Sequence, residues 1–395
     1  MPSRTRRISD EQRRARLARR HHLATKERAA DVPTAVRDLV AVHSTDPASV
    51  FLGLAARVRG ATVESIEHEM YEARSLVRML GMRRTVHVVP VDLVPIVHAS
   101  STRAIAVRER KRWLDLVEQA GITPDPVGWL CEAEQATLRA LRARGEATAA
   151  ELSRSVPALR AQVEFGAGKK WAGRISASTR VLFLLAADGQ IVRGRPRGTW
   201  TSSQYRWAPM SSWLPTVTEE PPVATARAAL VQRWLRAYGP GTIGDVRWWT
   251  GWTVSDVRRA LSALEVEEVE VGVGTGIVLA DDVAPVRSVA PFAALLPSLD
   301  TTVMGWTERG WFLGPHGPQL FDRSGNAGPT VWWDSRVVGG WTQRENGEIV
   351  YRLLEDVGTE GTTAVDDEVE RLSSWLGSAR VAPRFRTPLQ RELAS

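Results

Sequence analysis

A run of polar side chains near the N-terminus has the residue types needed for acid–base chemistry. The segment Ala41-Val-His-Ser-Thr-Asp-Pro-Ala-Ser49 places an imidazole, two hydroxyls and a carboxylate at four consecutive positions, at the end of a helix predicted over 33–42. A neutral imidazole can accept a proton near neutral pH, because its unperturbed pKa is about 6.5. A hydroxyl can bind a water, and a carboxylate can stabilise a developing positive charge. His43, Thr45 and Asp46 are therefore candidate catalytic residues.

The same residues also suit a purely structural role. Ser44 or Thr45 followed by Asp46-Pro47 is typical N-cap and first-turn chemistry for a helix, here predicted over 49–58. His43, at the end of the preceding helix, would interact favourably with the C-terminal dipole of that helix. The sequence leaves both interpretations open.

Composition indicates an ordinary folded chain with a basic balance. The 395 residues are 43% hydrophobic and 25% charged, enough for two to four domains. A net charge of +7 and a pI near 10.1 favour a phosphate-rich partner, although an arginine-rich composition is also typical of GC-rich genomes. A single cysteine, Cys131, excludes an internal disulfide and any cysteine-based metal centre.

Neither a cofactor nor a membrane is expected from these features. The adjacent His21 and His22 would point in divergent directions on a helix, so we predict no metal site. The arginine-rich N-terminus lacks the apolar core of a signal peptide, and no apolar run approaches the roughly 20 residues that span a bilayer. We expect a cytoplasmic, nucleoid-associated monomer.

Three stretches share one plan, in which helices are followed by a short hairpin. The clearest stretch predicts helices over 223–238, 243–250 and 254–264, then strands over 266–273 and 276–280. This is the helix–turn–helix–hairpin order of a winged helix. The first stretch has its hairpin at 76–82 and 85–89, and the second has strands near 190–194 and 205–207. A long helix leading from position 92 toward 117 would link the first two modules.

After residue 282 the pattern changes to short strands, turns and tryptophans. Strand-like runs lie at 303–306, 310–313, 330–333, 337–343 and 349–353, and a last helix is predicted over 366–376. The predicted fold class is thus α+β, with three tandem winged-helix modules followed by a C-terminal antiparallel β-barrel. The predicted domains are 1–118, 119–218, 219–283 and 284–395.

Several basic residues are candidates for contact with double-stranded DNA. Hairpin tips can enter a groove while arginines fix the register on phosphates. The flexible segment Gly166-Ala-Gly-Lys-Lys-Trp-Ala-Gly173 could follow a phosphate backbone, although an ordinary solvated loop is an equal alternative. The predicted DNA-binding residues are Arg83, Arg84, Lys169, Lys170, Arg174, Arg180 and Arg309. His87 and His98 flank the first hairpin, where a packing role is the simpler interpretation.

The order of modules and several phrases resemble one family, the bacterial winged-helix DNA glycosylases of the AlkZ and YcaQ type. The matching phrases are Arg83-Arg-Thr-Val-His-Val-Val-Pro90, Trp248-Trp-Thr-Gly251, Leu295-Leu-Pro-Ser-Leu-Asp300 with Gly305-Trp-Thr-Glu-Arg309, and Arg384-Phe-Arg-Thr-Pro-Leu389. The resemblance implies a basic concave surface around duplex DNA, with alkylated or crosslinked purines as substrate and no cofactor.

The resemblance also gives the polar segment a role. The family's Gln-x-Gln or Gln-x-Asp motif, which holds the attacking water, falls where this chain has His43, Ser44 and Thr45, so both motif positions differ. By this comparison His43 is the base or water holder, Thr45 a second hydrogen-bond partner, and Asp46 a stabiliser of the cationic sugar.

Two other functions fit parts of the same pattern. The altered motif favours a non-enzymatic winged-helix protein, such as a regulator or a lesion binder. The 16 tryptophans would suit a protein that sequesters a DNA-reactive compound, but the basic charge argues against it. A regulator usually needs only one winged helix with a dimer or ligand domain, so the multi-module build favours the enzyme.

Overall fold

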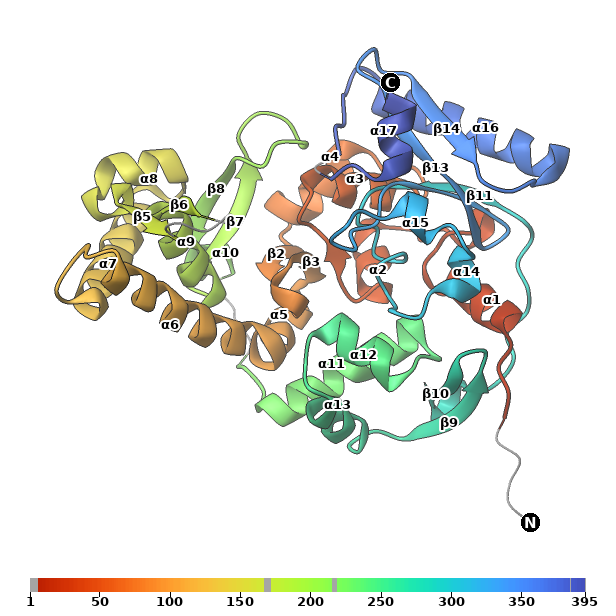
Figure 1. The fold of residues 1–395 in the computed structure, drawn as a ribbon, viewed down its shortest axis with the longest axis horizontal. Helices are drawn as coiled ribbons and strands as arrows, with labels where there is room; N and C mark the ends of the chain where they lie inside the picture. The colour runs from red at the N-terminus through yellow and green to blue at the C-terminus, as the bar shows by residue number, and fades with distance from the viewer. Residues whose placement is uncertain (1–5, 167–171, 215–218, 384, 395) are drawn as a thin grey trace.

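A computed structural model describes residues 6–166, 172–214, 219–383 and 385–394. The chain forms four groups of elements (Figure 1). Lys169 and Lys170, both predicted to contact DNA, lie outside the described residues.

The N-terminal group carries the polar segment on a small antiparallel sheet. Its strands follow the order β1-β3-β2, and the predicted hairpin is formed by β2 and β3. The elements are α1 (Asp10–Arg20), α2 (Val32–Asp38), β1 (Val42–His43), α3 (Pro47–Ala55), α4 (Val63–Glu67), β2 (Leu76–Leu80) and β3 (Val86–Pro90). Asp46 and Pro47 begin α3 as predicted, because the Asp46 side chain accepts the Ala48 amide and proline suits the first helical turn.

A nearly continuous helical segment leads into the second group, as expected for the link between modules. Short helical turns join α5 (Val94–Val97) to α6 (Arg103–Gln119) without a break. The group then contains α7 (Pro126–Arg144), β4 (Ala147–Thr148), α8 (Ala149–Ser155), β5 (Gln162–Phe165), β6 (Gly173–Ser176), α9 (Ala177–Ala187), β7 (Ile191–Pro196), β8 (Tyr205–Pro209) and α10 (Met210–Trp213). The β5–β6 hairpin was not predicted, since the glycine- and lysine-rich stretch between its strands hides the pairing.

The third group matches its prediction closely. It consists of α11 (Val223–Tyr238), α12 (Ile243–Thr250), α13 (Val254–Leu261), β9 (Val266–Val271) and β10 (Gly274–Leu279). Thr242 and Asp245 form a reciprocal capping box at the start of α12, and Gly251 ends that helix in the left-handed conformation. These local signals satisfy the backbone groups at the helix ends without distant partners, which is why they could be predicted.

The C-terminal β-barrel prediction is wrong. The strands β11 (Ala293–Leu296), β12 (Thr330–Trp333), β13 (Arg336–Gln343) and β14 (Ile349–Leu353) pair in simple order and, among the described residues, leave the sheet open. Two predicted strands are not strands, because 303–306 is a turn and 310–313 is the short helix α14 (Gly310–Leu313). Four-residue apolar runs fit a strand and a buried turn equally well. The remaining helices are α15 (Gly317–Leu320), α16 (Gly358–Leu376) and α17 (Pro388–Ala394).

Two main hydrophobic cores organise these groups. The larger core joins buried side chains of the N-terminal, third and C-terminal groups, for example Phe51, Trp234 and Trp332. The second core lies within residues 113–207 and includes Trp113 and Trp207. In Figure 1 the elements α6 to α9 and β5 to β8 accordingly form a lobe to one side of the remaining chain. The winged-helix assignment and the predicted domain boundaries stay predictions.

Candidate active site and DNA-contacting residues

His43 lies in the sheet of the N-terminal group, paired with another histidine. Strand β1 pairs with β3 so that His43 is opposite His87, and the two rings meet edge to face with centroids 5.3 Å apart. The exposed fractions are 5% for His43 and 4% for His87. The Thr45 amide points at His43 Nδ1 in a long contact of 3.5 Å.

Burial keeps the His43 ring neutral. Loss of hydration lowers the pKa of His43 to about 3, and the positive charge of Arg83 adds to the effect. Burial likewise holds the pKa of His87 well below its usual value. A neutral imidazole keeps a lone pair that can accept a hydrogen bond, but such a low pKa makes it a weak proton acceptor. His43 is therefore better suited to orienting a water than to removing its proton completely.

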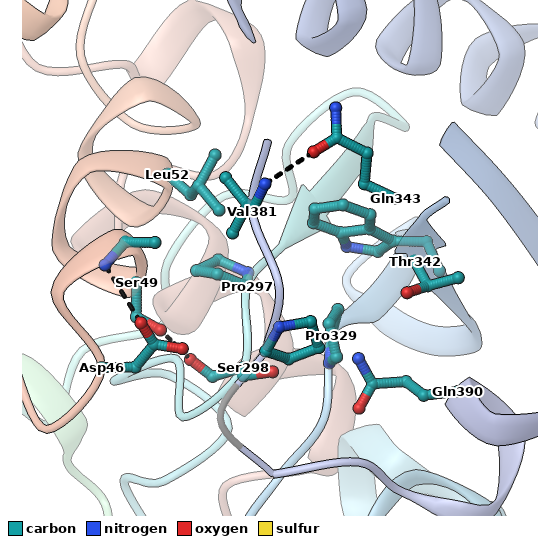
Figure 2. A pocket seen from close by; sticks show the side chains of 13 residues that line it. Asp46, Ser49, Leu52, Pro297, Ser298, Pro329, Thr342, Gln343, Val381 and Gln390 are labelled. Carbon is teal, nitrogen blue, oxygen red and sulfur yellow. Dashed lines mark hydrogen bonds between the residues drawn. The ribbon is translucent and has the colours of Figure 1, made fainter. Parts of the chain in front are cut away.

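Asp46 and Thr45 occupy different environments. Asp46 is 6% exposed, and its carboxylate accepts the Ala48 amide at 3.1 Å, so its helix-capping role is confirmed. Asp46 also borders a pocket of about 20 Å³, which has room for about one water molecule. Figure 2 shows Asp46 and Ser49 on one side of this pocket and Thr342 and Gln390 on the other. Thr45 is half-buried, which makes it the most accessible residue of the segment 43–46.

The backbone around the polar segment is fixed by residues of the C-terminal group. Thr301 Oγ1 donates to the Ala41 carbonyl at 2.7 Å, and Ser49 Oγ donates to the Ser298 carbonyl at 2.6 Å. Beneath them Arg57 forms a two-pronged ion pair with Asp300, and neither side chain is more than 2% exposed. The segment 295–300, which resembles the glycosylase family, thus supports the candidate site from a distant part of the sequence.

Arg78 is a contributor that the sequence interpretation missed. Its Nε donates to Ser44 Oγ at 2.8 Å and its Nη1 donates to the Tyr71 hydroxyl at 3.2 Å. Arg78 is 3% exposed, and it interrupts the otherwise apolar strand β2. A charge inside a buried strand requires polar partners, so this interruption was a usable signal.

Three of the arginines predicted to contact DNA are paired with carboxylates. Arg84 and Arg180 both bind Glu109, at 2.8 Å and 3.1 Å. Arg174 lies 3.4 Å from Glu164 on an exposed part of the β5–β6 hairpin. Arg84 and Arg180 therefore share one carboxylate, whereas the exposed pair of Arg174 and Glu164 can open to solvent.

Arg83 and Arg309 have a different environment. Both guanidinium groups lie over the ring of Trp248, with the central carbon 4.0 Å and 4.9 Å from its centroid, and Arg309 also lies over Phe321. Neither forms an ion pair with any residue that the structure describes. Burial lowers the pKa of each to about 10, and for Arg83 the nearby charge of Arg309 lowers it further. Both remain charged at neutral pH.

The other histidines do not join the candidate site. His98 contacts the Ala187 carbonyl and Glu220, while His21 lies beside Thr302 and is stacked on Trp306. Within the described ranges, no group of three or more His, Cys, Asp or Glu side chains is arranged to hold a metal ion. Among the same residues, no helix has the length and apolar character required to cross a bilayer.

Comparisons with known proteins identify the family of this chain. A family model described as "DNA glycosylase AlkZ-like" matches residues 36–375. A search of curated proteins found no match. Among solved structures, the Streptomyces sahachiroi DNA glycosylase AlkZ is similar, with 23% identity and a TM-score of 0.71 over 96% of this chain and 99% of the other. This chain therefore belongs to the AlkZ-like family of DNA glycosylases.

Proposed function

We propose that this protein hydrolyses the N-glycosidic bond of alkylated or crosslinked purine nucleotides in double-stranded DNA, with His43 holding the attacking water. Family membership supports the reaction class and DNA as the partner. The observation that supports the assignment is the buried His43 ring, which packs against His87 and lies beside Thr45, in the segment that by resemblance corresponds to the water-binding motif of the family.

The reaction makes modest demands on such a site. An N-alkylated purine already carries positive charge, so the bond from C1′ to the base nitrogen breaks with its electron pair moving to the base. Water then forms a new bond to C1′ and loses a proton to solvent. His43 accepts a hydrogen bond from this water, and Thr45 provides a second partner. A weak base suffices because the oxocarbenium-like sugar, rather than the water, drives bond formation.

Asp46 contributes charge instead of proton transfer. Its carboxylate is fixed by the cap to the Ala48 amide, so its position costs no reorganisation during the reaction. A fixed negative charge near a cationic sugar lowers the energy of the transition state. The capping role and the catalytic role are therefore compatible in one side chain.

The mode of DNA binding belongs to the same proposal. Three winged-helix modules, with boundaries near residues 118, 218 and 283, would present arginines to the duplex. Lys169, Lys170 and Arg174 would add contacts to phosphates, since the β5–β6 hairpin that carries Arg174 is exposed. We propose that the protein acts as a monomer in the cytoplasm, on DNA of the nucleoid.

Alkali-induced strand cleavage tests the assignment. Purified protein is incubated with a duplex carrying N7-methylguanine or a nitrogen-mustard crosslink, and abasic sites are then cleaved with alkali. We expect cleavage with the wild type, a strong loss with His43→Ala, and no change with the matched control His68→Ala, whose side chain is 56% exposed. Full cleavage by His43→Ala would overturn the role of His43.

A second candidate function is lesion binding without catalysis. The 5% exposure of His43 favours it, because a buried ring must become accessible to substrate water during the reaction. Tight binding of the alkylated duplex without release of any base would establish this alternative.

A further inference from the structure

Residues from three separate segments of the sequence line one pocket. Arg83 comes from the turn between β2 and β3, Trp248 from α12, and Arg309 from the residue that precedes α14. All three line a pocket of about 430 Å³, together with Phe321 and the turn 324–326. Arg83, Trp248 and Arg309 each lie in a sequence segment that resembles the glycosylase family. The pocket is therefore built from parts of the chain more than 200 residues apart.

The backbone is shaped to bring Arg83 into this pocket. Arg83 has φ +53° and Arg84 has φ +60°, a conformation that side chains other than glycine adopt rarely. Gly251 allows the close approach, since a Cβ there would lie 3.3 Å from Arg83 Cα and Gly251 itself has φ +74°. Left-handed non-glycine residues occur preferentially at ligand clamps and active sites.

Among the described residues neither cation of the pocket forms a direct ion pair, although the charges of Asp245 and Glu308 act on Arg309, whereas the charge that acts on Arg83 is the like charge of Arg309. The Nε atom of Arg83 is buried and has no hydrogen-bond partner among the described residues. Arg84, next in sequence, is instead paired with Glu109. Two like charges beside one tryptophan ring repel each other, and an anion bound between them would remove that repulsion.

We propose that Arg83 and Arg309 form a single anion site that binds one phosphodiester phosphate of the DNA strand next to the damaged nucleotide. Trp248 keeps both planar guanidinium groups in position, and such groups bind phosphate oxygens through paired hydrogen bonds. Strand β3, which follows the turn that contains Arg83, carries His87, the neighbour of His43, so the bound phosphate would place the sugar relative to His43. This inference rests on the proposed function only in taking DNA as the partner.

The salt dependence of DNA binding separates one shared phosphate from two independent contacts. Affinity is measured for an undamaged duplex at several salt concentrations, so that no base release is required. Each of Arg83→Gln and Arg309→Gln should reduce the slope of log K against log[salt] by about 1. The double variant should lose about the same amount, because both residues serve one phosphate. The control Arg344→Gln, at an arginine that pairs with Glu348 in the C-terminal group, should leave the slope unchanged.

A scan with uncharged methylphosphonates locates that phosphate. In the wild type, one substituted position should weaken binding by about tenfold, and the same substitution should have no effect in the double variant. If Arg83→Gln does not fold, Arg83→Lys serves instead, and it should keep the slope and lose affinity. A slope reduced by about 2 in the double variant, or an equal effect of methylphosphonates in both proteins, would overturn the proposal.

Calorimetric titration with inorganic phosphate distinguishes a site for free phosphate from a site for DNA phosphate. Binding of free phosphate to the wild type without any sensitive methylphosphonate position would identify an anion site that does not serve DNA, and would contradict the assignment. If no methylphosphonate position weakens DNA binding by the wild type while base release is intact, this inference alone is refuted. Intact phosphate recognition without base release would instead refute only the proposed function.

Discussion

Acid should destabilise this protein through its buried histidines. His21, His43 and His87 are at most 5% exposed, and burial lowers the pKa of each ring in the folded state. A histidine with a lowered folded pKa contributes stability that is complete above its unfolded pKa of about 6.5. That stability is lost as the pH falls below 6.5, because only the unfolded chain then binds the proton.

The expected loss is large. Between pH 7.5 and pH 5.0, His43, whose folded pKa is about 3, costs about 2 kcal/mol of unfolding free energy, and the lowered pKa values of His21 and His87 act in the same direction. Domains of this kind are commonly stable by only about 5–15 kcal/mol. Urea unfolding followed by tryptophan fluorescence at the two pH values measures the difference directly.

Substitutions test whether the buried histidines cause this pH dependence of stability. Replacing the buried His43 ring by a group that does not titrate, as in His43→Asn, should reduce the difference between the two pH values by about 2 kcal/mol. The exposed His68 provides the control, since His68→Ala should leave the difference unchanged. Equal stability of the wild type at both pH values, or a His43 ring that titrates near pH 6.5 by NMR, would refute the reasoning.

Three further substitutions test other parts of the structure. Arg57→Ala should lower the free energy of unfolding by about 3–5 kcal/mol in urea titrations, because it leaves the Asp300 carboxylate buried and unpaired, and an unchanged value would contradict the ion pair's role. Thr45→Val should reduce the single-turnover rate of base release by about tenfold or more without weakening duplex binding, and weakened binding alone would reassign Thr45 to DNA contact. Ser44→Ala should cost about 1.5–3 kcal/mol of unfolding free energy by removing the partner of Arg78 Nε, and a cost near zero would show that this bond is not needed.

Elements with local signals could be predicted from the sequence. The bounds of α11 and α12 agree with the prediction because prolines precede α11 and Gly239 ends it, while a capping box begins α12 and Gly251 ends it. Elements that depend on distant partners were missed or misassigned. Strand β1 has only two residues and exists through its pairing with β3. The strands β12 to β14 were predicted, but the open sheet also depends on β11, whose Ala293 pairs with Trp333, 40 residues away.

The candidate site shows the same division. His43, Thr45 and Asp46 are contiguous, so their residue types alone indicated possible chemistry. The burial of His43 against His87 depends on strand register, which the sequence does not reveal. Arg83 and Arg309 were each predicted to contact DNA. They are 226 residues apart in the sequence, so it could not be predicted that both lie over Trp248. Only the folded chain brings them together.

Single-turnover release of N7-methylguanine from a duplex tests the role of His43 most directly. The account predicts that His43→Ala lowers the rate by about 100-fold, equivalent to about 2.7 kcal/mol, with duplex affinity unchanged. His43→Gln should recover much of this loss, because an amide can also hold the water. A His43→Ala rate equal to that of the wild type would contradict the central claim that this ring positions the attacking water.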